Sequence, residues 1–165
     1  MNPLQRPAVQ HRPMQVADLD AVMVIEPQCY EFPWTRGNFV DSLAAGHETE
    51  LALDAAAGLI GYRVAMVGVD EMHLLNLAVH PAWQGRGHAH LLLLRLLDDC
   101  RRLALATLWL EVRTGNQRAH QLYQRWGFRE VGLRRAYYPA AAGSREDAVV
   151  MRLPVPAQSA SHALD

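Results

Sequence analysis

The sequence predicts an α/β fold with a mixed sheet, and three observations lead to this prediction. The 165 residues are 50% hydrophobic and 20% charged, which suits one globular domain with a full core. Apolar, partly β-branched runs of strand length alternate with segments whose apolar residues recur at helical spacing. Helices separate some consecutive strands, and helical crossovers join parallel neighbours, so the sheet is expected to contain both strand directions.

The first part of the chain is predicted to form one strand and two helices. Residues 9–15 form a strand that Pro13 confines to an edge or a bulge. A helix begins near Asp18, where acidic residues favour a helix N-terminus, and ends at Pro27. A second, short helix covers residues 35–44.

The remainder of the chain is predicted to form three strands, a helix, a strand, a helix and two strands. The three apolar runs at 50–53, 59–69 and 72–79 indicate an antiparallel meander, and residues 87–105 have the apolar spacing of a helix. Strict alternation predicts a strand over 107–113. Asn116 can cap a helix that stops at Gly127, and the last strands cover 128–138 and 147–153. Residues 9–153 are therefore expected to form a single domain, with 1–8 and 154–165 as flexible tails.

The composition excludes several classes of function. All 16 basic residues are arginine, so the chain has neither a Schiff-base lysine nor the lysine of a phosphate loop. A net charge of −1 provides no general attraction to nucleic acid or to a membrane surface. The two cysteines lack metal-ligand spacing, and no stretch is apolar enough to cross a membrane. We expect a cytoplasmic protein, with a monomer as the simplest state.

The most informative motif joins the strand that ends at Val79 to the following helix. It reads Gln84-Gly-Arg-Gly-His-Ala89, a glycine-bearing turn that opens a helix. Such a turn directs unpaired backbone N–H groups at one point, which favours a pyrophosphate. An ordinary helix entry is the alternative. A dinucleotide-binding fingerprint fits less well, because His90 stands in place of its third glycine.

This motif resembles the acyl-coenzyme A pyrophosphate loop of the GNAT N-acetyltransferases, and the predicted order of elements matches their fold. Further segments resemble the RimI branch of that family, which acetylates the N-terminal alanine of a small-subunit ribosomal protein. They are Tyr30-Glu-Phe-Pro-Trp34, Leu75-Asn-Leu-Ala-Val79, Leu108-Trp-Leu-Glu-Val-Arg113, Leu122-Tyr123 with Gly127-Phe128, Arg134-Arg-Ala-Tyr-Tyr-Pro139 and Arg145-Glu-Asp-Ala148. The resemblance implies acetyl-CoA as cosubstrate, the N-terminus of a ribosomal protein as partner, and no metal.

Two residues are candidates for the proton transfers of such a reaction. Glu111 is an acidic residue in an otherwise apolar strand, and the matching glutamate of RimI-like enzymes is the general base. Tyr123 lies on the apolar stripe of its helix, and the matching tyrosine protonates the leaving thiolate. The alternatives are a solvated strand carboxylate and a core aromatic residue.

The resemblance also assigns binding residues. It implies that the acetyl and pantetheine arm binds to Leu77, Ala78 and Val79. It implies that the pyrophosphate binds to Gly85, Arg86, Gly87, His88, Ala89 and His90, and that Asn116 makes a further contact with the cofactor. The residues expected to bind the acceptor peptide are Tyr30, Trp34, Tyr137 and Tyr138. Helix capping by Asn116 and loop packing of the aromatic residues are the alternatives.

Two other functions are compatible with these motifs. A GNAT enzyme can act on a small-molecule amine or on a lysine side chain, and a coenzyme A-binding or ribosome-associated module can lack catalysis. Acetylation of such amines in place of an Ala-initiated peptide would identify the first, and cofactor binding without turnover the second.

Overall fold

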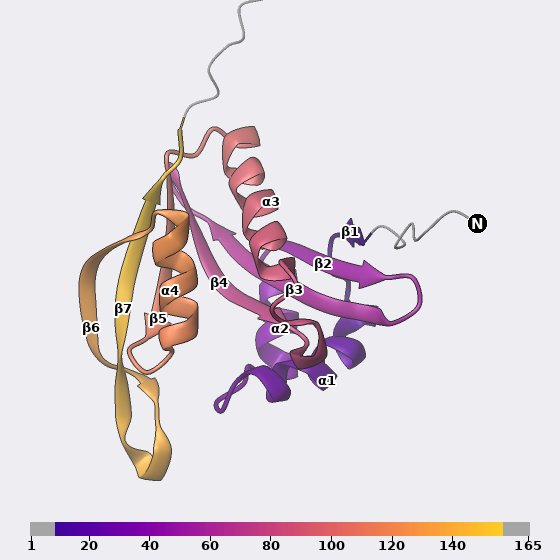
Figure 1. Ribbon diagram of the computed structural model, residues 1–165, viewed down its shortest axis with the longest axis horizontal. Helices are drawn as coiled ribbons and strands as arrows, with labels where there is room; N and C mark the ends of the chain where they lie inside the picture. Colours follow the sequence, from indigo (N-terminus) through magenta and orange to yellow (C-terminus); the bar gives the residue numbers. More distant parts are fainter. Residues whose placement is uncertain (1–8, 157–165) are drawn as a thin grey trace, which may run out of the picture. The chain divides into compact units, whose positions relative to one another are not determined.

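The computed structural model describes residues 9–156, which form seven strands and four α-helices (Figure 1). The strands are β1 (Gln10–Arg12), β2 (Glu48–Asp54), β3 (Gly58–Val67), β4 (Glu71–Val79), β5 (Thr107–Arg113), β6 (Arg129–Pro139) and β7 (Arg145–Pro154). The helices are α1 (Leu19–Cys29), α2 (Arg36–Ala44), α3 (His88–Arg102) and α4 (Gln117–Trp126). Each predicted strand and helix is present.

The chain divides into two compact units, which are described separately. The first contains the residues up to Val67 together with Leu74–Leu94, and the second contains Gly68–His73 with the residues from Arg95 onward. β4 and α3 each begin in one unit and end in the other.

In the first unit, β1 pairs antiparallel with β2, and β2 with β3. The apolar face of α1, which includes Leu19, Val22 and Ile25, packs with Phe39 of α2 and with Tyr62 and Val64 of β3. Thr35 caps α2 by accepting a hydrogen bond from the Asn38 N–H. The segment of residues 30–35 connects the two helices.

In the second unit, the strands follow the order β5-β7-β6, and both pairings are antiparallel. Leu108, Leu110 and Val112 are buried, whereas the residues between them, including Glu111, are partly exposed. The predicted alternation of β5 is therefore confirmed. At α4, Asn116 accepts a hydrogen bond from the Ala119 N–H at 3.2 Å, and Gly127 ends the helix at a φ of 96°.

Two helix ends differ from the prediction. α1 continues through Pro27 to Cys29, because a proline in the last turn removes only one hydrogen bond of the helix. α3 stops at Arg102 instead of residue 105, because Ala104 adopts a φ of 55° and the Leu105 N–H bonds back to the Cys100 carbonyl. At the C-terminal end, β7 includes Pro154, and the Val155 N–H donates to the Ala106 carbonyl at 2.8 Å. Residues 1–8 and 157–165 of the predicted tails lie outside the described residues.

None of the helices in the described part of the chain has the length and apolarity required to span a membrane.

Candidate active site

The predicted site residues fall into two sets, one in each unit. The first unit contains Tyr30, Trp34, Leu77, Ala78, Val79 and the segment 85–90. The second contains Glu111, Asn116, Tyr123, Tyr137 and Tyr138. The two sets are considered in turn.

Both glycines of the turn in the first unit adopt a positive φ. Gly85 and Gly87 have φ values of 73° and 86°, and a Cβ at either position would meet no atom within 4 Å. The backbone is therefore open on that side. α3 begins at the next residue, His88, and the first N–H groups of a helix have no partner within it. Residues 85–90 thus fit an anionic group such as the pyrophosphate of coenzyme A.

The side chains beside this turn are held in place. The Gln84 side-chain amide donates to the Val79 carbonyl at 2.9 Å. The Arg86 guanidinium lies 5.0 Å from the centre of the Trp83 ring, and the same ring meets His88 edge to face at 5.6 Å. Gln84 therefore ties the turn to the end of β4, and Arg86 adds a positive charge next to it.

The end of β4 contacts the segment that follows α1. Ala78 and Val79 are buried and Leu77 is half-buried. The Tyr30 hydroxyl donates to the Leu77 carbonyl, and the Cys29 thiol donates to the Val79 carbonyl at 3.3 Å. Tyr30, which is expected to bind the acceptor peptide, thus contacts β4, which is expected to bind the acetyl arm.

Glu26 organises this region, and its role was not foreseen. Its carboxylate is buried, 1% exposed, and accepts hydrogen bonds from the Trp34 N–H at 2.9 Å, from the Asn76 amide at 3.1 and 3.2 Å and from the Tyr62 hydroxyl. Burial and then the Glu26 charge raise the pKa of Tyr62, and the same two causes raise the pKa of Cys29 to about 11. Glu26 continues the buried stripe that starts at Leu19 and Val22, which is the sequence signal for a buried acid.

Glu111 lies in a polar cluster on β5 in the second unit. Its carboxylate pairs with the Arg134 Nε at 2.9 Å, and its side chain is 22% exposed. The Tyr138 hydroxyl donates to the Glu111 carbonyl at 3.3 Å. Burial, followed by a hydrogen bond to the Glu111 carboxylate, raises the pKa of Tyr137. The Glu111 carboxylate is therefore partly exposed and contacts Arg134 and Tyr137, while Tyr138 contacts the backbone of the same residue.

Tyr123 is buried on α4, and its ring meets Phe128 edge to face at 5.6 Å. Burial, with a smaller effect of Tyr138, raises the pKa of its hydroxyl. The phenol is therefore protonated at neutral pH and able to donate a proton. Asn116 caps the same helix, so its structural alternative is confirmed, while its cofactor contact stays a prediction.

The two tyrosines of β6 form a pair between arginines. Their ring centres are 4.9 Å apart at 78°, with the guanidinium of Arg113 over Tyr138 at 4.4 Å and that of Arg134 over Tyr137 at 5.3 Å. Burial and then the Glu111 charge raise the pKa of Tyr138 to about 12. Arg134 is paired with Glu111 and Arg145 donates to backbone carbonyls, so both charges are partly offset.

The chemistry available in these two sets is proton transfer at a carboxylate and a phenol, together with anion binding at a helix entry. Within residues 9–156 no group of three or more His, Cys, Asp or Glu side chains is arranged to hold a metal ion.

Comparison with known proteins agrees with this chemistry. The sequence pattern of the acetyltransferase (GNAT) family matches residues 19–128. The [ribosomal protein bS18]-alanine N-acetyltransferase of Salmonella typhimurium is 38% identical over 142 residues, which is 86% of this chain and 95% of that protein.

Solved structures extend the likeness to the fold. The crystal structure of the ribosomal-protein-S18-alanine N-acetyltransferase from Escherichia coli has a TM-score of 0.82 and 32% identity, and the match covers 96% of this chain and 100% of that one. A phosphinothricin acetyltransferase from Sinorhizobium meliloti, solved in complex with acetyl-CoA, has a TM-score of 0.72 at 20% identity over 89% of this chain and 88% of that one, and so shares the fold.

The predicted fold class, the acyltransferase activity and the family resemblance are therefore confirmed. The chain belongs to the GNAT family of acetyltransferases, in the RimI branch of ribosomal-protein alanine N-acetyltransferases.

Proposed function

We propose that this enzyme transfers the acetyl group of acetyl-CoA to the N-terminal alanine of ribosomal protein bS18. The observation that carries the proposal is the 38% identity across 95% of the length of a relative named for that reaction. The site residues support it, because the chain has a candidate for each proton transfer and a turn that fits a pyrophosphate. A bacterial cytoplasm is the proposed location, since ribosomes are modified there.

We assign the first proton transfer to Glu111. An α-amino group has a pKa of about 7.7–8.0, so much of it is protonated at neutral pH and cannot attack. The Glu111 carboxylate, partly exposed on β5, accepts that proton directly or through water. For this it must exchange its ion pair with Arg134 for a contact with the amine.

We assign the second proton transfer to Tyr123. Acetyl-CoA supplies an acetyl thioester, and direct attack by the amine forms the amide bond as the carbon–sulfur bond breaks. The Tyr123 hydroxyl gives its proton to the departing sulfur, for which its raised pKa keeps it ready at neutral pH. The attacking nitrogen loses its second proton to water as the amide forms. Exchange with solvent then returns Glu111 to the carboxylate and Tyr123 to the phenol, so the reaction releases one proton overall.

The remaining roles concern binding. Gly85 to His90 hold the pyrophosphate through backbone N–H groups, and Leu77 to Val79 hold the arm of the cosubstrate with a backbone N–H polarising the carbonyl oxygen. Asn116 adds a cofactor contact. Tyr30, Trp34, Tyr137 and Tyr138 line the path of the acceptor peptide, and the tyrosine pair beside Glu111 places aromatic surface next to the base.

A peptide assay tests the proposal. Purified enzyme and acetyl-CoA are incubated with a synthetic peptide of the bS18 N-terminus that begins with alanine, and tandem mass spectrometry locates the acetyl group. We expect modification of the α-amine alone. The control peptide has the same sequence with its α-amine already acetylated, and it gains nothing.

The two alternatives give different results in this assay. Modification of the control peptide on a lysine, or of small amines in preference to the α-amine, would make this enzyme a different kind of GNAT acetyltransferase. Binding of coenzyme A with no turnover on any amine would make it a non-catalytic module.

A further inference from the structure

β6 contains a bulge that includes Tyr137, the first residue of its tyrosine pair. Arg134 pairs with Ala148 and Tyr138 pairs with Glu146, so three residues of β6 lie opposite Asp147 alone. The central residue, Ala136, has a φ of 49°, a left-handed conformation that is sterically unfavourable for a residue with a Cβ. The bulge therefore needs support from outside the strand pairing.

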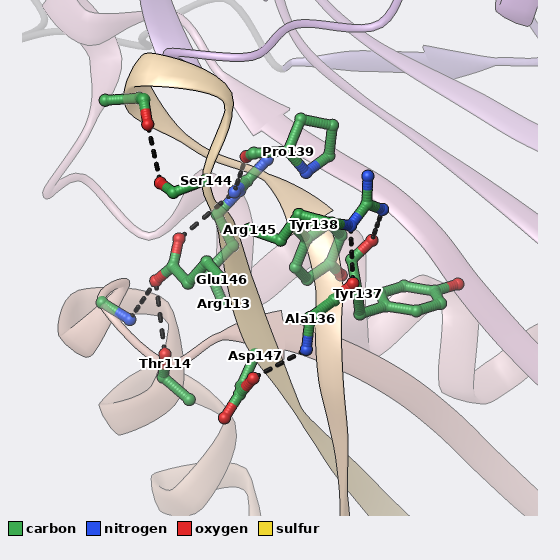
Figure 2. Close-up of polar contacts among 12 residues, drawn as sticks. Arg113, Thr114, Ala136, Tyr137, Tyr138, Pro139, Ser144, Arg145, Glu146 and Asp147 are labelled. Carbon is green, nitrogen blue, oxygen red and sulfur yellow. Dashed lines mark hydrogen bonds and ion pairs between the residues drawn. The ribbon is translucent and has the colours of Figure 1, made fainter.

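Two side chains of β7 provide this support (Figure 2). The Asp147 carboxylate accepts a hydrogen bond from the Ala136 N–H at 2.7 Å. The Arg145 guanidinium donates to the Ala136 carbonyl and to the Tyr137 carbonyl, both at 2.6 Å. Arg145 and Asp147 are two residues apart on a strand and so project from the same face. We call these two residues the bulge clamp.

The bulge determines how Tyr137 and Tyr138 are presented. A slip of one residue in a strand moves a side chain to the other face of the sheet, so the extra residues decide which tyrosine faces which way. In the clamped arrangement both tyrosines contact Glu111, the candidate base. Tyr137 remains 41% exposed and so is available to a ligand.

The residue between the two clamp members has a different task. Glu146 accepts hydrogen bonds from the Gly115 N–H at 2.6 Å and the Thr114 hydroxyl at 3.3 Å, and pairs with Arg113 at 3.2 Å (Figure 2). It holds the loop between β5 and α4 instead of the bulge. The support of the tyrosine pair can therefore be separated experimentally from the support of that loop.

We propose that Arg145 and Asp147 are positioning residues for the acceptor peptide, which act by holding the Ala136 bulge so that Tyr137 and Tyr138 face the peptide beside Glu111. This inference rests on the proposed function, because it assigns the clamp to that acceptor. It predicts an effect on the KM for the peptide and none on the KM for acetyl-CoA.

The experiment compares Asp147→Ala with the control Glu130→Ala. Glu130 is also a carboxylate of this hairpin, and its contact with the His120 ring at 2.5 Å does not involve the bulge. We expect Asp147→Ala to raise the KM for the Ala-initiated peptide about tenfold, with the KM for acetyl-CoA within twofold and the Tm close to that of the control. Glu130→Ala should change neither KM.

A second substitution distinguishes positioning from a general structural role. Glycine adopts a positive φ without a steric penalty, so Ala136→Gly should recover part of the peptide KM when it is added to Asp147→Ala. An unchanged peptide KM in Asp147→Ala, or equal rises in both KM values, would overturn the proposal.

Amide hydrogen exchange tests whether the clamp holds the bulge, and this test does not depend on the identity of the acceptor. Amide exchange across residues 134–138 should become faster in Asp147→Ala and stay unchanged in Glu130→Ala, whatever the substrate. If the unaltered enzyme acetylates no Ala-initiated peptide, the proposed function fails, and faster exchange still supports the clamp. Unchanged exchange would show that Asp147 does not hold the bulge.

Discussion

Glu111 is the residue whose surroundings matter most to the proposed chemistry. A carboxylate in water at this position would be free to take a proton, whereas here it pairs with Arg134 and contacts Tyr137, and Tyr138 donates to the backbone carbonyl of the same residue. The alternation of β5 allowed Glu111 to be selected from the sequence. Its partners could not be selected, because they come from β6, where the bulge determines the side-chain directions.

Replacing Glu111 with glutamine tests its role as the base. The amide cannot accept the proton, so kcat for the peptide should fall by about 10²–10⁴-fold at neutral pH. Acetyl-CoA binding, measured by calorimetry, should be nearly unchanged. Turnover equal to that of the unaltered enzyme would remove Glu111 from the mechanism.

The raised pKa of Tyr123 predicts the form of the pH profile. The acid must be protonated, and a raised pKa extends the protonated form to higher pH. As pH rises, the substrate amine loses its proton while Tyr123 keeps its own. The value of kcat/KM should therefore rise through pH of about 8, near the pKa of the amine, and remain level to about 9.5. A decline of kcat/KM between pH of about 8 and 9.5 that disappears in Tyr123→Phe would contradict the raised pKa of Tyr123.

At the scale of the element, the helices and strands that can be predicted are those whose first or last residues mark the boundary in the sequence. β5 was predicted at its observed bounds, because alternation starts and stops at polar residues. Thr35, Asn116 and Gly127 mark helix ends by their own chemistry. Ala104 and Ala136 adopt positive φ without being glycine or asparagine, so neither the end of α3 nor the bulge of β6 has a sequence signal.

The loop between β5 and α4 depends on one carboxylate. Bonds from the Gly115 N–H, and then from Arg113, lower the pKa of Glu146. A lowered folded-state pKa stabilises the protein above the unfolded value of about 4.3, and this contribution is lost as pH falls through the folded-state pKa. Glu146→Gln should therefore lower the Tm at pH 7 by about 2–4 °C.

The same pair of proteins at low pH provides the control for this prediction. As pH falls and Glu146 becomes protonated in the folded protein, the Tm difference between the two should shrink. A difference of the same size at both pH values would mean that the charge of Glu146 does not support the loop.

The glycine turn before α3 can be tested by enlarging one residue. Gly87 has a φ of 86°, and a Cβ there would project into open space on the side expected to receive the pyrophosphate. Gly87→Val should weaken acetyl-CoA binding by at least about tenfold, both through backbone strain and through obstruction. Calorimetric titration with coenzyme A measures this, and retained affinity would mean that another loop binds the phosphates.

At the scale of the whole molecule, composition and charge become easier to interpret. The absence of lysine excludes no step of the proposed reaction, since backbone N–H groups, Glu111 and Tyr123 account for binding and proton transfer. It also means that any lysine acetylation found in an assay belongs to the substrate. The net charge of −1 conceals local pairing, since Arg134 and Arg145 are both engaged.

Buried polar residues are the feature of the molecule that is hardest to predict from the sequence. The burial of Glu26 depends on contacts with Trp34, Tyr62 and Asn76, which are 8, 36 and 50 residues away. Only the assembled first unit brings these groups together. The sequence motifs identify the family, whereas the buried contacts that hold those motifs in place are visible only in the structure.

The most direct test of the central claim is mass spectrometry of intact ribosomal proteins. Small ribosomal subunits from a strain that lacks its own acetyltransferase are incubated with acetyl-CoA and this enzyme. We expect one acetyl group on the N-terminal alanine of bS18, and none when the enzyme carries Glu111→Gln. Unmodified bS18, with acetylation of other proteins or of lysine side chains, would contradict it.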